Sequence, residues 1–135
     1  MSQWRREAIE QLPEFHKLIT SELVDNPMML WIELTFEFDR LCEKSDPPID
    51  LLRRMWRYCE WCLHHRNIDV RISAALPFCE HLICYPATAR MLPRIMPERR
   101  FLELRDLLLY LNSEEEIDRW HRELWPKLKK RGYLK

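Results

Sequence analysis

The residues best suited to chemistry in this sequence are cysteines and histidines that occur in two neighbouring stretches. Cys59 and Cys62 are three residues apart, and Cys79 and His81 follow in the next predicted helix. Two residues spaced in this way share one face of a helix. Zinc binds four such thiolate and imidazole groups in a tetrahedral arrangement. The pattern therefore predicts either a metal site or a redox thiol group, made from Cys59, Cys62, Cys79 and His81.

A second interpretation places the same cysteines in the hydrophobic core. Cys59 and Cys62 fall on the apolar stripe of their helix, where cysteine behaves as a small hydrophobic residue, and Cys79 does the same in the next helix. Zinc knuckles usually hold their cysteines in a tight turn near glycine, but the only glycine is Gly132. The five cysteines are an odd number, and reduced thiols are the default without an export signal. We favour buried thiols and expect no cofactor.

Carboxylates provide the remaining candidates for catalysis. An acid–base site would need acidic groups that face each other across a pocket, and Glu33, Glu60, Glu80 and His81 lie on predicted central helices. The sequence contains neither the Glu-x-x-His pairs of di-iron bundles nor a His-Glu-x-x-His or Gly-x-Ser-x-Gly motif. We interpret these acids as solvated or ion-paired. The protein is expected to be non-enzymatic, and a pocket between helices is the one enzymatic alternative.

Composition excludes several other classes of function. The 22 Lys and Arg residues balance the 22 Asp and Glu residues, so no overall positive charge favours nucleic-acid binding. One glycine among 135 residues excludes the glycine-rich loops of dinucleotide and phosphate sites. No apolar run reaches the length of about 18 residues that a membrane helix needs. The charged start of the sequence is unlike a signal peptide, which predicts a cytoplasmic protein.

Six tryptophans are more than one small core needs. A tryptophan that reaches the surface beside arginine is typical of protein-binding hot spots. We therefore predict a protein partner, with no nucleic acid and no membrane involved. The predicted partner-binding residues are Trp61, Arg57, Glu60, Glu80 and His81.

Every predicted element is a helix, because apolar residues recur at spacings of three and four and no segment alternates like a strand. The expected helices cover 3–11, 13–23, 28–44, 48–65, 69–85 and 97–111, and a last one begins after Ser113 and runs to about residue 131. Pro77 should kink or split the fifth helix, and Pro126 should kink the last. Three prolines in 86–97 predict only one short helical turn there. Ser113 and Glu116 form a capping-box pattern.

Two helices have apolar patterns that predict their packing. In 28–44, one stripe contains Leu30, Trp31, Leu34, Phe38 and Leu41. Met28, Met29, Ile32 and Phe36 widen it, which predicts neighbouring helices on more than one side. In 69–85, the expected core residues include Ile72 and Leu76, and in the last helix they are Ile117, Trp120, Leu124 and Leu128.

These elements predict an all-α fold with a single domain over residues 1–135. Short helices occupy 1–26, and core helices occupy 27–131. Mostly short connections favour antiparallel neighbours in an irregular bundle of about six helices. Residues 28–65 and 69–111 each have the length of a helix pair of about 40 residues, so stacked hairpins of HEAT-like character are the alternative.

Several phrases resemble a family of small, all-helical bacterial proteins described as a domain of unknown function. They are LWIEL at 30–34, DLLRRMWRYCEWCL at 50–63, FCEHL at 78–82 and MLPRIMPERRFLELRDLLLYLNSEEEI at 91–117. The resemblance covers roughly 25–120 and implies a bacterial, cytosolic, single-domain protein. In that family a small apolar residue is common at the position of Cys59, which argues against zinc. The resemblance implies no catalytic residue.

Together these patterns predict a non-enzymatic protein-interaction module, such as an accessory or immunity-type binder. The alternative is a metal-binding or redox helical protein that uses the Cys/His cluster.

Overall fold

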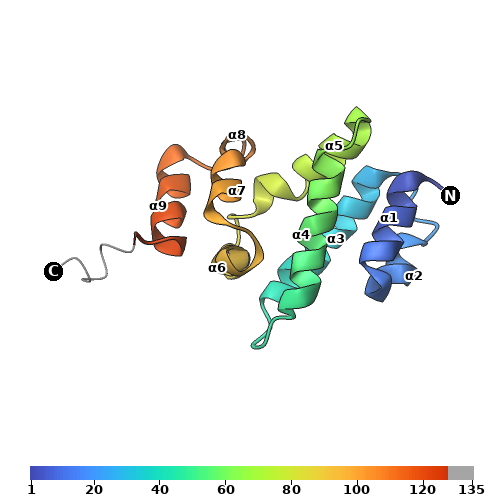
Figure 1. Ribbon diagram of the computed structural model, residues 1–135, viewed down its shortest axis with the longest axis horizontal. Helices are drawn as coiled ribbons and strands as arrows, with labels where there is room; N and C mark the ends of the chain where they lie inside the picture. The colour runs from blue at the N-terminus through green and yellow to red at the C-terminus, as the bar shows by residue number, and fades with distance from the viewer. Residues whose placement is uncertain (128–135) are drawn as a thin grey trace.

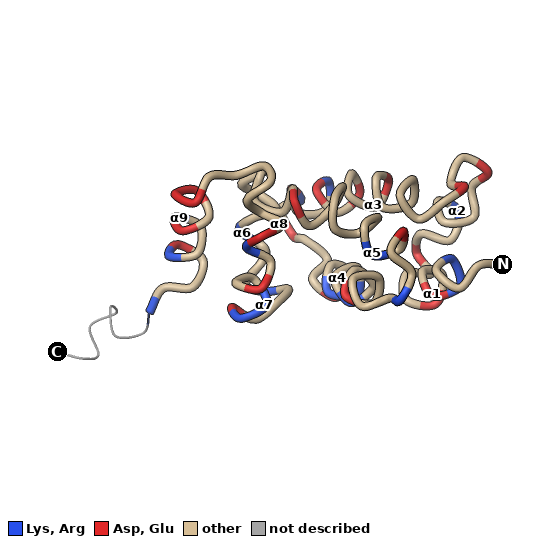
Figure 2. Tube along the Cα trace, turned by 90° about the horizontal axis from the view of Figure 1, so that it is seen from above, with Lys and Arg blue, Asp and Glu red and all other residues tan. Residues whose placement is uncertain are grey.

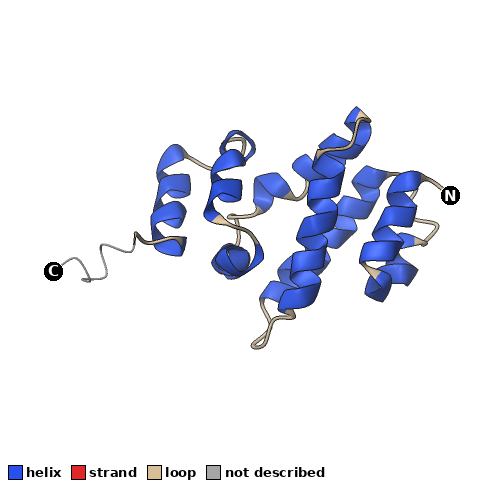
Figure 3. Ribbon diagram, viewed as in Figure 1, coloured by secondary structure: helices blue, strands red, loops and turns tan. Residues whose placement is uncertain are grey.

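The structure, a computed structural model, describes residues 1–127 and contains only helices and loops within them (Figure 3). The α-helices are α1 (Gln3–Gln11), α2 (His16–Ile19), α3 (Pro27–Cys42), α4 (Ile49–Leu63), α5 (Ile68–Ala75), α6 (Pro86–Ile95), α7 (Glu98–Glu103), α8 (Arg105–Leu108) and α9 (Glu114–Leu124). Two 3₁₀ turns, η1 (Pro13–Phe15) and η2 (Cys79–His81), complete them. The all-α prediction is confirmed for the described residues.

The helices form an elongated row from the N-terminus to the C-terminus (Figure 1). Helix α5 packs against both α3 and α4, α1 packs against α4, and α6 contacts α3, α4 and α9. The described part of the chain has nine α-helices where about six were expected. The segment 86–97, which was expected to hold one short turn, forms α6, and the segment 97–111 divides into α7 and α8.

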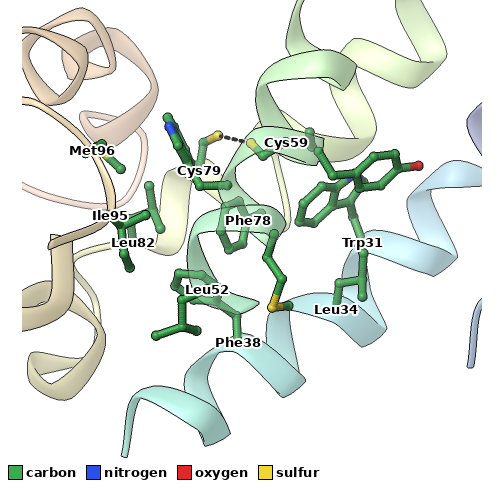
Figure 4. Packing of buried hydrophobic residues seen from close by; sticks show 14 of the residues in the cluster. Trp31, Leu34, Phe38, Leu52, Cys59, Phe78, Cys79, Leu82, Ile95 and Met96 are labelled. Atoms are coloured by element: carbon green, nitrogen blue, oxygen red, sulfur yellow. Dashed lines mark hydrogen bonds between the residues drawn. The ribbon is translucent and has the colours of Figure 1, made fainter. Parts of the chain in front are cut away.

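The centre of the core is a group of aromatic side chains from α3, α4 and the segment after α5 (Figure 4). The Trp31 ring stacks on Tyr58 at 5.4 Å and lies 4.8 Å from Phe78, which contacts Phe38 edge-on at 4.9 Å. Aromatic pairs at these separations add to the free energy gained by burying their area. The predicted stripe of α3 is confirmed, since Leu30, Trp31, Leu34, Phe38 and Leu41 are all buried.

The opposite side of α3 carries apolar residues that no described element covers. Met29, Ile32 and Phe36 are 37%, 41% and 67% exposed, so they do not widen the buried stripe as predicted, although α3 does contact α2, α4, α5 and α6. These positions lie opposite the buried stripe at 3.6 residues per turn. Helix α5 contacts α3, and just after α5 the Pro77 carbonyl accepts a hydrogen bond from the Thr35 hydroxyl at 3.2 Å.

Prolines end helices at some positions and begin them at others. Pro86 occupies the first turn of α6 and Pro93 lies inside it, yet the helix runs for ten residues, so the prediction of one short turn is wrong. The N–H groups of the first turn have no acceptor within the helix, so a proline at that position loses no hydrogen bond. The predicted split at Pro77 is confirmed, because α5 ends at Ala75. Helix α9 ends before Pro126 rather than kinking.

Three further predictions about helix limits and registers need correction. The segment 97–111 divides at Leu104, whose amide bonds to the Phe101 carbonyl in a tight turn that lets both side chains stay buried. Helix α5 buries Val70, Ser73 and Ala74, at spacings of three and four, whereas Ile72 and the following Leu76 are exposed, so the buried side differs from the predicted one. The helix expected over 13–23 ends at Ile19.

Helix capping agrees closely with the sequence. The Asn26 side chain accepts the Met29 amide at 2.9 Å at the start of α3. Ser113 and Glu116 form the predicted capping box of α9. At α4 the N-cap position is Pro48, and no side chain caps this helix. In α9, Ile117 and Trp120 are buried as expected, whereas Leu128 lies outside the described residues.

Two phenylalanines two residues apart on α3 test this orientation of the helix. Phe38→Ala should lower the free energy of unfolding by about 3–5 kcal/mol, because Phe38 is 1% exposed and its loss leaves a cavity. Phe36→Ala should change it by less than about 0.5 kcal/mol, because Phe36 is 67% exposed. Urea denaturation measures both values, and similar losses from the two variants would contradict the orientation.

Candidate functional site

The predicted partner-binding residues fall in two separate regions. Arg57, Glu60 and Trp61 line one surface cleft of about 810 Å³ beside α4, together with Gln3 of α1 and Arg100 of α7. Glu80 and His81 lie in η2, and neither lines that cleft. The structure therefore brings three of the five residues together.

The cleft is rich in positive charge. The Arg100 guanidinium forms an ion pair with Glu60 at 2.5 Å, whereas the side chains of Arg57 and Arg66 form no ion pair within the described chain. The Trp61 ring stacks on Tyr58 at 5.9 Å and lies 5.0 Å from the His65 ring, so Trp61 is partly buried. These groups give the cleft an aromatic wall and two unpaired arginines.

Glu80 and His81 are poorly satisfied polar groups. Glu80 is 8% exposed, and its Oε2 atom has no hydrogen-bond partner in the described structure. Burial raises the pKa of the Glu80 carboxyl, which the neighbouring His81 partly opposes. The Nδ1 atom of His81 is also without a partner there. Buried polar groups of this kind favour a functional role, since leaving them unpaired costs about 1–3 kcal/mol each.

The acids considered for catalysis do not converge. Glu33, Glu60 and His81 line three different pockets, and Glu60 is already paired with Arg100. Glu80 lines none of these three. The arrangement gives no support to acid–base chemistry by this set.

Two of the four predicted thiol and imidazole ligands meet in the core. The Cys59 and Cys79 sulfur atoms are 3.5 Å apart (Figure 4), a thiol–thiol contact longer than the bond of about 2.05 Å in a disulfide. Cys62 instead accepts the Trp31 indole N–H at 3.4 Å. Burial raises the pKa of the Cys59 thiol, and it raises the pKa of Cys62 to about 11. Within residues 1–127, no three such groups are placed to hold a metal ion.

One further surface was not predicted from the sequence. We call it the outer apolar face and define it as Leu23, Met29, Ile32, Phe36 and Tyr85. These side chains are between 37% and 79% exposed. Leu23, Met29 and Ile32 line a pocket of about 640 Å³, and Ile32 continues into a second pocket with Phe36 and Tyr85. The signal was present in the wide apolar perimeter of α3, which the sequence interpretation assigned to the core.

No protein-family model, curated protein or solved structure matches this chain. The resemblance to a family of bacterial helical proteins therefore stays a prediction. Among residues 1–127, none of the helices has both the length and the apolar character required to cross a membrane.

The thiols provide a test of the buried-cysteine interpretation. Cys84 is exposed, and the other four cysteines are buried. One thiol per chain should react rapidly with Ellman's reagent at pH 8 in the native protein. The other four should react at least about a hundredfold more slowly, because they need the structure to open.

In denaturant all five thiols should react at one rate, and Cys84→Ser should abolish the rapid phase of the native protein. Rapid reaction of two or more thiols in the native Cys84→Ser variant would contradict the burial of this group.

Proposed function

We propose that this protein is a non-enzymatic interaction module, an accessory or immunity-type binder that acts by holding one protein partner on its outer apolar face. Reduced thiols and the family resemblance support a bacterial, cytoplasmic setting for this role. The proposal involves neither nucleic acid nor a membrane.

The observation that carries this proposal is the exposure of Phe36 and its neighbours. Phe36 is 67% exposed and Tyr85 is 56% exposed, and both line the same two pockets. Single exposed apolar residues are ordinary, but a connected apolar surface commonly marks a binding site. Each large side chain that a partner buries fully contributes about 1.5–3 kcal/mol. Three or four such residues contribute about 5–12 kcal/mol together, which is comparable with the cost of association of about 4–15 kcal/mol, so a tight complex also needs contacts outside this face.

The rigidity of α3 supports the same role. Its inner side is fixed by Trp31 and Phe38, so the outer residues are presented on a preorganised helix. Preorganisation lowers the conformational entropy that binding must overcome. We also propose that the elongated row of helices is a HEAT-like stack, because such stacks display long surfaces to partners. The cleft with Arg57, Glu60 and Trp61 is then a second contact region.

Affinity purification with quantitative mass spectrometry tests the proposal. The full chain and its Ile32→Glu/Phe36→Glu variant are used to capture proteins from cells of its source. One protein should be recovered stoichiometrically with the unchanged chain and at least about tenfold less with the variant, because two buried apolar contacts are replaced by carboxylates.

A matched control carries the same change elsewhere. Leu102→Glu/Leu111→Glu alters two residues that are 47% and 48% exposed near α7 and α8. This control should capture the same protein as the unchanged chain, and circular dichroism should show that both variants remain folded. Equal recovery with all three proteins would refute the outer apolar face as the binding surface. An Arg57→Glu/Trp61→Ala variant reports separately on the cleft.

A thiol redox or metal function is the second candidate, and the contact between Cys59 and Cys79 favours its redox form. Hydrogen peroxide would convert the two thiols to a disulfide and itself be reduced to two water molecules, so the protein would lose two hydrogen atoms. Intact mass and metal content of the purified chain, compared with a Cys59→Ser/Cys62→Ser variant, test this candidate. A chain that holds no zinc or iron and resists peroxide would eliminate it.

A further inference from the structure

A carboxylate lines the same two pockets as the two aromatic residues of the outer apolar face. Phe36, Asp39 and Tyr85 together line two adjoining pockets, of about 250 Å³ and 350 Å³. Phe36 and Asp39 are three residues apart on α3, so they share one side of that helix. Tyr85 occupies the N-cap position of α6, without a side-chain capping hydrogen bond. Helix α3 and the start of α6 thus place two aromatic rings and one carboxylate around the same two pockets, and we call this space the gap between Phe36 and Tyr85.

The Asp39 carboxylate accepts one side-chain hydrogen bond and forms no ion pair with Lys or Arg in the described chain. Its Oδ1 atom accepts the Thr88 hydroxyl at 2.6 Å, and no lysine or arginine of the described chain forms an ion pair with it. Arg40, the nearest basic residue in sequence, is instead paired with Glu37. Burial raises the pKa of the Asp39 carboxyl, and the Thr88 hydrogen bond opposes that shift. A partly buried carboxylate without a counter-ion bears a desolvation cost that a bound cation would offset.

The other titratable groups that line the two pockets are His81, Glu43, Tyr85 and Arg40, and the guanidinium of Arg40 is paired with Glu37. His81 lines the smaller pocket and lowers the pKa of Asp39, and Glu43 lines the larger pocket and raises it. Helix α3 carries three acidic residues, Glu33, Glu37 and Asp39, and one basic residue, Arg40 (Figure 2). The electrostatic character of this region therefore favours a positively charged ligand.

Resting on the proposed function, we propose that the gap between Phe36 and Tyr85 receives an arginine side chain of the protein partner. A guanidinium is planar, stacks on aromatic rings and offers several N–H donors to a carboxylate. It can contact both rings while it donates to the Asp39 oxygen that Thr88 leaves free. The partner segment therefore carries an arginine next to apolar residues that cover Ile32 and Met29.

Asp39 is a specificity residue in this arrangement, and Asp39→Asn tests it without removing the acceptor for Thr88. The charge-assisted hydrogen bonds to the guanidinium would become neutral ones, so binding of the arginine should weaken at least tenfold. Asp106→Asn is the matched control, because Asp106 is an exposed acid of α8 that forms no ion pair in the described chain.

The direct measurement is an NMR titration of the ¹⁵N-labelled full chain with N-acetyl-arginine amide. We expect the amide signals of Phe36, Asp39, Tyr85 and Thr88 to move together, in the unchanged chain and in Asp106→Asn. In Asp39→Asn, the probe concentration that gives half of the full shift should be at least tenfold higher. The N-acetyl-citrulline amide, which has the same shape without the charge, should leave them unchanged.

Three results would overturn the inference. They are no movement with the arginine probe, an equal response to N-acetyl-lysine amide, and an unchanged response in Asp39→Asn. Capture of the partner and binding of the arginine probe are separate measurements, so a failure of the proposed function can be told apart from a failure of this inference. If Ile32→Glu/Phe36→Glu loses the captured protein while the arginine probe fails, the face binds a partner without this contact. If the probe binds but capture never depends on the face, the arginine site exists and the interaction proposal fails.

Discussion

The position of the Trp31 indole determines the arrangement of the central helices. Its ring packs between Tyr58 of α4 and Phe78, and its N–H donates to the Cys62 sulfur at 3.4 Å. A buried indole needs both close packing and a partner for its donor. These contacts fix the rotation of α3 about its axis. Because Trp31 must point inward, the side of α3 that carries Phe36 must point outward, and the candidate binding surface follows from the core.

Sequence periodicity identified the buried side of α3, but it did not show that the apolar residues on the other side of α3 are exposed, and it misplaced the buried side of α5. The stripe through Leu34 and Phe38 was predicted correctly, since i, i+4 spacing and apolar side chains suffice for that. The exposure of Ile32 depends on which helices occupy the space around α3, and this is a property of the whole fold. Proline gave a similar ambiguity, because Pro86 begins a helix while Pro77 separates two.

The candidate sites divide in the same way. Arg57, Glu60 and Trp61 line one cleft because they lie on one helix, where local geometry fixes their separation. Glu80 and His81 were assigned to the same surface, yet they lie in η2, beyond the turn at Pro77. The gap between Phe36 and Tyr85 joins residues 49 positions apart and depends on the packing of α6 beside α3. No spacing rule within the sequence predicts such a contact.

The most direct test of the outer apolar face is site-specific photo-crosslinking in living cells. A photoreactive phenylalanine derivative at position 36 places the reactive group on the face with little change of shape, and the same derivative at position 102 gives the comparison. The account predicts that position 36 crosslinks to one protein in high yield and that position 102 does not. If position 36 crosslinks to nothing, or both positions capture the same scattered proteins, the outer apolar face is not a binding surface.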